Sequence, residues 1–330
     1  MRTGKTFALA YHRYNSRELL PVEHCPISSA LINRAIEAVW RLGRAGRVSS
    51  VIQQIGFFAD ADDKRLLLEV TLPDGYWTLP AQPTLKEFAA ELRDAIPEVV
   101  GVALFRAVSP GVLVRAERHR SFGDDDLTYV TGGCHRGPEH AGVEYRVSGG
   151  SFFQTNRYLI DTLIELVTKD RAGDHALDLY AGAGLLTLPL SQTFRQVTAV
   201  EAAPFAFHDL KRNAPSNVHS FRGTAEQFLV SVVSGLSGFR SGNQKPGTAN
   251  DETVFDLIVV DPPRAGLGDV VPRLLDDLRV PRLTYVSCDP ATLARDLKEL
   301  LAAGFRIDEL HLIDLFPQTF NLETVAQLKR

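Results

Sequence analysis

The stretch ALDLYAGAGLLT, residues 176–187, is the part of the sequence most informative about the fold. An apolar run reaches Tyr180 and passes directly into a turn with glycine at positions 182 and 184. A glycine-rich turn after a strand lets the backbone approach a nucleotide-like ligand, and an acidic residue about 20 positions later can bind a ribose diol. Glu201 stands at that distance, at the end of the next apolar run. The pattern predicts an α/β nucleotide-binding domain in which Gly182, Gly184 and Glu201 contact the ligand.

The glycine spacing also separates two classes of cofactor. A dinucleotide fingerprint has a third glycine at the place that Thr187 occupies here. Since the turn lacks that glycine, we expect S-adenosylmethionine rather than NAD. A helix is predicted to start near Leu185, directly after the turn.

Residues 151–330 alternate between short apolar runs and helical patterns, which is typical of a doubly wound, mostly parallel sheet. The last two runs are joined by a short loop, so we expect them to be antiparallel neighbours. The expected strands are 176–180, 196–200, 218–221, 255–260, 283–286, 307–313 and 324–328.

Residues 1–150 combine strand-like runs with two helical patterns and predict a smaller α+β domain with antiparallel pairing. Ser28 is the expected N-cap of the first helix, and the second is expected over residues 84–96. The chain is thus expected to divide into domains 1–150 and 151–330, which suits its 330 residues.

The composition restricts the function classes. A net charge of -4 argues against a protein that binds nucleic acid by bulk electrostatics, although residues 1–50 carry eight Lys or Arg against three acids. The three cysteines form no CxxC pair, so we expect no metal site. No apolar run is long enough for a membrane span and no signal peptide is apparent, so a cytoplasmic protein with no membrane partner is expected.

Two further strand ends carry reactive residues. The run 255–260 breaks into Asp261-Pro-Pro-Arg264, where the prolines impose a rigid loop. The next run ends at Cys288, just before a helix whose N-terminus is expected to favour a thiolate. Because ligands bind at the carboxyl ends of such strands, Gly182, Asp261 and Cys288 are expected around one crevice.

These motifs together resemble the RNA (uracil-5-)-methyltransferase family. They occur in the order typical of that family, and the resemblance covers essentially all of residues 145–330, whereas the first half is similar mainly at HCPI, residues 24–27. The motifs are SFFQTN (151–156), DLYAGAG (178–184), DPPRAGL (261–267), YVSCDPATLARDL (285–297) and FPQTFNLETV (316–325).

The resemblance implies a Rossmann-like catalytic domain of S-adenosylmethionine-dependent methyltransferases, preceded by a domain that faces the RNA. The implied substrate is a uracil in tRNA or rRNA, which must leave its stack to react. Cys288 would add to C6, making C5 nucleophilic enough to take the methyl group. Glu323 would then remove the C5 proton, with Asp261 between cofactor and base. The implied cofactor-binding residues are Gln154, Tyr180, Gly182, Gly184, Glu201 and Asp261.

The chain departs from the family pattern at two places. Asn321 stands where a histidine is usual, two residues before the basic glutamate, and an amide cannot relay a proton near neutral pH. Of the cysteines that hold an iron–sulfur cluster in many relatives, Cys25 alone has a counterpart, so no cluster is expected. The N-terminal RNA-binding barrel of many relatives is also not seen. We expect a monomer, and Cys134 has no assigned role.

Three alternatives stay open from the sequence. An RNA 5-methylcytosine methyltransferase also uses a cysteine adduct, but its proline-cysteine motif is not seen at Cys288. Enzymes that methylate amino groups have an aromatic residue at the place of Arg264. A degenerate RNA- or cofactor-binding protein is suggested by Asn321.

Overall fold

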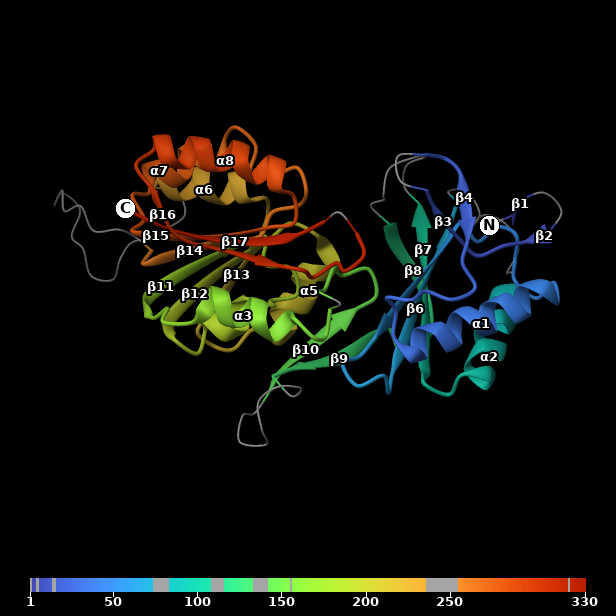
Figure 1. Ribbon diagram of the computed structural model, residues 1–330. Helices are drawn as coiled ribbons and strands as arrows, with labels where there is room; N and C mark the ends of the chain where they lie inside the picture. The colour runs from blue at the N-terminus through green and yellow to red at the C-terminus, as the bar shows by residue number, and fades with distance from the viewer. Residues whose placement is uncertain are drawn as a thin grey trace. The chain divides into compact units, whose positions relative to one another are not determined.

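The computed structural model describes residues 2–3, 6–13, 16–73, 83–107, 116–132, 142–154, 156–235, 255–319 and 321–330. The chain divides into two compact units (Figure 1). The first comprises residues 1–129 and 147–150, and the second comprises residues 130–146 and 151–330. Residues 130–146, which were expected with the first domain, thus lie with the second unit.

A seven-stranded sheet forms the centre of the second unit, in the order β13-β12-β11-β14-β15-β17-β16. The first five strands in this order are parallel, while β17 runs antiparallel to both β15 and β16. The predicted α/β fold with an antiparallel terminal strand is therefore confirmed. The strands are β11 (Gly173–Leu179), β12 (Phe194–Glu201), β13 (Val218–Arg222), β14 (Leu257–Val260), β15 (Arg282–Ser287), β16 (Arg306–Ile313) and β17 (Glu323–Lys329).

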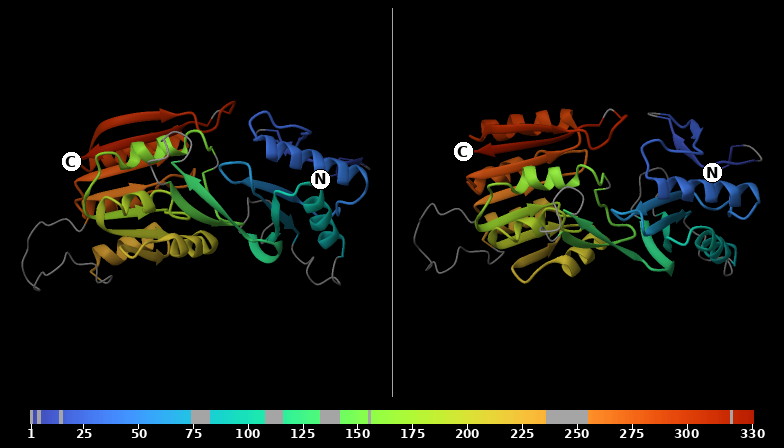
Figure 2. Two further views of the ribbon diagram at one scale, coloured as in Figure 1. Left: turned by 90° about the horizontal axis from the view of Figure 1, so that it is seen from below. Right: turned by 60° about the horizontal axis from the view of Figure 1, so that its bottom comes forward.

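Helices cover both faces of this sheet, as Figures 1 and 2 show. One face carries α3 (Ile160–Thr168), α4 (Thr187–Leu190) and α5 (Pro204–Asn213), and the other carries α6 (Ala225–Val233), α7 (Val271–Asp277) and α8 (Pro290–Ala302). Because both faces are covered, β14 is apolar throughout, with Ile258 and Val260 in one core and Leu257 and Val259 in the other. Helix α8 starts where Asp289 caps the N–H groups of Ala291 and Thr292.

The first unit contains a four-stranded sheet in the order β5-β6-β7-β8. Two helices pack on one face of it through a shared apolar core. The elements are α1 (Ala30–Arg44), β5 (Gln54–Ala59), β6 (Leu66–Leu72), α2 (Pro83–Ala95), β7 (Val99–Ala107) and β8 (Ala116–Gly123). Short antiparallel pairs join β1 (Arg2–Thr3) to β2 (Thr6–Phe7) and β3 (Ala10–His12) to β4 (Leu19–Pro21), and β9 (Asp126–Thr131) neighbours β10 (Val143–Ser148).

Three expectations were wrong in detail. Strands β6 and β7 are parallel, because α2 lies between them in the chain and serves as a crossover. Ser29 caps α1 in place of Ser28, accepting the N–H of Ile32. The helix expected from Leu185 is reduced to the single turn α4. None of the described helices is long and apolar enough to cross a membrane.

Candidate active site

The predicted site residues of the second unit gather where the parallel strands end. Tyr180, Asp261 and Cys288 each follow the last residue of a strand, β11, β14 and β15 respectively, and Glu201 ends β12. Glu323 reaches the same place from the opposite direction, since β17 is antiparallel to β15. The ladder pairs Ser287 with Thr324, so Cys288 and Glu323 are the next residues along the two strands.

The glycine turn after β11 is fixed by the Glu201 carboxylate. One oxygen accepts the N–H of Gly182 at 2.8 Å and the other accepts the N–H of Ala203 at 2.6 Å. Gly182 has a φ of +57°, which favours glycine, and a Cβ built there would have no described atom nearer than 3.9 Å. An open, backbone-lined turn beside an acidic side chain fits the nucleoside part of adenosylmethionine.

A buried hydrogen bond joins Asp178 and Thr187, which lie before and after this turn in the sequence. The Thr187 hydroxyl donates to one oxygen of Asp178 at 2.5 Å, while the other oxygen has no hydrogen-bond partner among the described residues. Desolvation raises the pKa of Asp178 to about 7, although the Thr187 hydrogen bond opposes the shift. Thr187 stands where a dinucleotide-binding motif has its third glycine, and here it donates a hydrogen bond to a buried acid. The glycine spacing alone did not indicate this role.

The segment with Gln154 is anchored beside the turn. Gln154 is buried, the Ser151 hydroxyl donates to buried Asp209 of α5 at 2.6 Å, and the Asn156 amide donates to the carbonyl of Leu315 at 2.9 Å. The carbonyl of Phe152 is the described atom that a Cβ on Gly182 would meet first. Gln154 thus belongs to a segment that passes next to the glycine turn.

Tyr180 and Gly184 shape the turn in different ways. Tyr180 has a φ of +65°, which is uncommon for a residue with a side chain. Its ring is half-buried and packs against the core beneath α6, α7 and α8. At Gly184 the φ of +98° favours glycine, and a Cβ there would come within 2.8 Å of the end of the Leu188 side chain, which would have to shift.

Three ionisable side chains interact electrostatically at the strand ends. Burial raises the pKa of Asp261 to about 8, and the charge of Glu323 adds to the shift. Burial also raises the pKa of Glu323 to about 7, and this side chain is 3% exposed. The half-buried thiol of Cys288 has a raised pKa, first through burial and then through Glu323 and Asp261, while the cation of Arg264 lowers it. The N-terminus of α8 was expected to favour the thiolate, but the pKa of this thiol is raised, with burial as the largest cause.

The described part of the chain contains no group of three or more His, Cys, Asp or Glu side chains placed to hold a metal ion. Cys25 is buried in the first unit, where its backbone N–H and carbonyl are both bound by the side chain of Asn33. Cys134 lies outside the described residues. The absence of an iron–sulfur cluster stays a prediction.

The basic character of residues 1–50 is partly balanced within the first unit. Four arginines of this segment form ion pairs with acids: Arg13 with Glu18, Arg34 with Glu98, Arg44 with Glu23, and Arg47 with Glu91. These pairs reduce the positive field that the sequence count had suggested, because each cation lies beside an anion.

Comparisons with known proteins match this architecture. A family model for tRNA (uracil-5-)-methyltransferase matches residues 138–330. An uncharacterized RNA methyltransferase of Aquifex aeolicus is 29% identical over 324 residues, covering 97% of this chain and 67% of the relative. Another from Enterococcus faecalis is 28% identical over 338 residues, with the same shares covered.

The fold is similar to the crystal structure of the Pyrococcus abyssi tRNA (uracil-54, C5)-methyltransferase in complex with S-adenosyl-L-homocysteine. The TM-score is 0.69 at 22% identity, covering 96% of this chain and 72% of the other. This chain spans about two thirds of the length of the curated relatives described above. The match over more than half of its residues shows that the chain belongs to the tRNA (uracil-5-)-methyltransferase family, RNA methyltransferases that use S-adenosylmethionine.

Proposed function

We propose that this protein methylates C5 of a uracil in RNA through a covalent bond between Cys288 and C6 of the base. The observation that carries the proposal is the electrostatic coupling of Cys288, Glu323 and Asp261 at one edge of the sheet. A nucleophile and a base beside a cofactor turn are the parts that this reaction needs.

Cys288 supplies the first step. C5 of uracil is a weak nucleophile, and addition of a thiolate to C6 moves an electron pair from the C5–C6 double bond toward the C4 carbonyl oxygen. Since the raised pKa keeps Cys288 as a thiol at rest, it must lose its proton before attack, and its partial exposure leaves a route to solvent. Arg264 favours the thiolate in this step.

Glu323 supplies the last step. After C5 has taken the methyl group, the C5 proton must leave so that the C6–S bond can break and the aromatic ring can reform. A carboxyl group with a pKa of about 7 is a suitable base near neutral pH, because it is partly ionised and still basic. Asp261 is mostly protonated near pH 7 and so spares the thiolate a second nearby anion. Asn321 does not serve as a proton relay.

The cofactor, when bound, supplies an electrophilic methyl group on a sulfonium. We assign its binding to Gln154, Tyr180, Gly182, Gly184, Glu201 and Asp261. The carboxylate of Glu201 orients the turn through Gly182 and would bind the ribose hydroxyls. The buried segment with Gln154 passes beside that turn and would enclose the rest of the molecule.

We propose that the RNA substrate is tRNA, and that rRNA is the alternative to be tested. The matched family and the Pyrococcus abyssi enzyme are both named as tRNA methyltransferases. We assign RNA contact to the first unit.

The test is methylation of unmodified tRNA and rRNA, taken from cells that lack the gene, by purified protein with methyl-labelled adenosylmethionine. Nucleoside mass spectrometry should find labelled 5-methyluridine, which Cys288→Ser should abolish. Labelled 5-methylcytidine or an N-methylated nucleoside would replace the proposal with another methyltransferase specificity. A protein that binds adenosylmethionine but labels neither RNA would support the degenerate binding protein.

A further inference from the structure

Helix α8 carries a buried acid, Asp296, that the reaction as proposed does not use. Its side chain is 1% exposed. The carboxylate accepts the N–H of Leu267 at 2.7 Å and the hydroxyl of Tyr285 at 2.7 Å, and it pairs with Arg295 at 2.8 Å. Burial of a charge destabilises a protein unless hydrogen bonds and ion pairs replace the lost hydration. The presence of the Asp296 carboxylate on the apolar face of α8 therefore needs an explanation.

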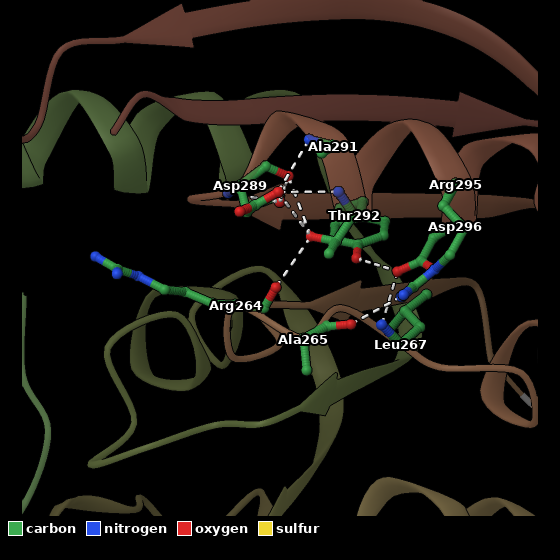
Figure 3. Close-up of polar contacts among 10 residues, drawn as sticks. Arg264, Ala265, Leu267, Asp289, Ala291, Thr292, Arg295 and Asp296 are labelled. Carbon is green, nitrogen blue, oxygen red and sulfur yellow. Dashed lines mark hydrogen bonds and ion pairs between the residues drawn. The ribbon is translucent and has the colours of Figure 1, made fainter. Parts of the chain in front are cut away.

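The reason lies in the loop that follows β14. Thr292 of α8 donates to the carbonyl of Arg264 at 3.1 Å, and Arg295 donates to the carbonyl of Ala265 at 2.8 Å. Together with the contact from Asp296 to Leu267, three residues of one helix bind three residues of the loop, as the dashed lines in Figure 3 show.

The close approach is built into the loop at Gly266. A Cβ on this residue would lie 2.4 Å from the Asp296 carboxylate, and its φ is +75°. Any larger residue would therefore displace the loop from the helix. Gly266 thus allows the loop backbone to lie directly against the buried carboxylate of Asp296.

The contact between the loop and α8 connects segments that carry the proposed catalytic residues. Asp261 and Arg264 lie on the loop, Cys288 directly precedes α8 and its N-cap, and Tyr285 lies on β15 three residues before Cys288. We infer that Asp296 is a positioning residue that holds loop 261–267 on α8 and so fixes Asp261 and Arg264 relative to the Cys288 thiol. Its catalytic meaning rests on the proposed function, but the geometry can be tested without it.

The position of the Arg264 side chain depends on the loop backbone. Its side chain is exposed and makes no hydrogen bond or ion pair with the described residues, and in Figure 3 it extends away from the contacts of the loop. Its place beside Cys288 therefore depends on its backbone, which Thr292 and the Asp296 contacts hold. The Arg264 cation lowers the pKa of the Cys288 thiol, whereas Asp261 on the same loop and Glu323 on β17 raise it. Removing the Arg264 charge should therefore raise the pKa of the thiol only while the loop holds that cation beside the sulfur.

The experiment is the pH dependence of Cys288 alkylation by iodoacetamide in the full chain, read by mass spectrometry on the peptide that contains Cys288. Arg264→Gln in the otherwise unchanged chain should shift the profile upward by about half a pH unit, as expected when a nearby cation is lost. Asp296→Asn removes an anion and also loosens the loop that carries both Asp261 and Arg264, so the direction of its own shift does not separate these causes. The separating measurement is the Arg264→Gln change made in Asp296→Asn, where its upward shift should fall to about half or less, because the loosened loop no longer holds the cation beside the thiol.

Two further variants serve as controls. Asp276→Asn makes the same chemical change on α7, where the carboxylate binds Arg330, and in that background Arg264→Gln should give its full upward shift. If Asp296→Asn shows no cooperative unfolding transition, Thr292→Val removes one loop contact without a charge change, and in that background the shift caused by Arg264→Gln should be reduced by a smaller amount. An Arg264→Gln shift that is as large in folded Asp296→Asn as in the otherwise unchanged chain would overturn the inference. Neither RNA nor cofactor enters the assay, so failure of the proposed function would not affect its outcome.

Discussion

Glu323 provides the most quantitative prediction, because its protonation should control the last step of the reaction. Burial raises its pKa from 4.5 to about 7. A base must be ionised to take the C5 proton, so the ionised fraction should rise about tenfold between pH 6 and pH 8. With an ordinary pKa near 4.5, the fraction would hardly change over this range. Breakdown of the methylated adduct should therefore speed up about tenfold from pH 6 to pH 8.

The assay has to isolate this step from thiol ionisation, which also increases with pH. Excess protein and labelled adenosylmethionine are mixed with RNA in a single turnover, and the pH is then changed by a second mixing. Denaturing gels follow the labelled RNA that stays attached to protein, and the rate of its release is measured at each pH. In the adduct, sulfur is bonded to C6, so Cys288 no longer titrates.

A matched variant shows whether Glu323 is the group observed. Glu323→Gln keeps the size of the side chain but cannot accept the proton, so release should slow by about 10²–10⁴-fold and lose its pH dependence. A wild-type release rate that is flat from pH 6 to pH 8, or a Gln variant that releases product as fast as wild type, would refute the assignment.

Two other perturbations follow from the cofactor turn. The pKa of Asp178 is raised from 3.8 to about 7 in the folded state, so ionisation destabilises the fold as the pH rises from about 4, and the full cost is reached above about 7. In denaturant titrations at pH 8, the free energy of unfolding of Asp178→Asn should thus exceed that of wild type by up to about 4 kcal/mol, and the difference should vanish near pH 4. A variant that is less stable than wild type at pH 8 would contradict this. Glu201→Ala leaves the N–H groups of Gly182 and Ala203 without their acceptor, and calorimetry should show adenosylmethionine binding weakened by roughly tenfold or more. Unchanged affinity would remove Glu201 from the site.

The sequence predicted the strands of the second unit well because their apolar runs are bounded by residues that cannot continue a strand. The glycines after β11 and the prolines after β14 set those ends, and parallel connections bring such ends to one edge. The antiparallel place of β17 followed from its short connection to β16, and it determines that Glu323 meets Cys288.

Other features depend on contacts between distant segments, which a single sequence does not display. The parallel pairing of β6 with β7 competes with many antiparallel arrangements of the same runs. The raised pKa of Cys288 arises from burial and from two acids on other strands, whereas the sequence showed the helix start alone. Asp296 could have been noticed as an acid between Leu293 and Leu300 on the apolar face of α8.

The covalent bond between Cys288 and C6 of the base can be trapped with 5-fluorouracil. Fluorine at C5 cannot be removed as a proton, so the methylated adduct cannot break down. RNA transcribed with 5-fluorouracil is incubated with the protein and adenosylmethionine, digested, and analysed by mass spectrometry. We expect a methylated nucleotide on the peptide that contains Cys288 and no adduct in Cys288→Ser. Turnover of ordinary RNA without any adduct on the fluorinated RNA, or an adduct on Cys25 or Cys134, would contradict it.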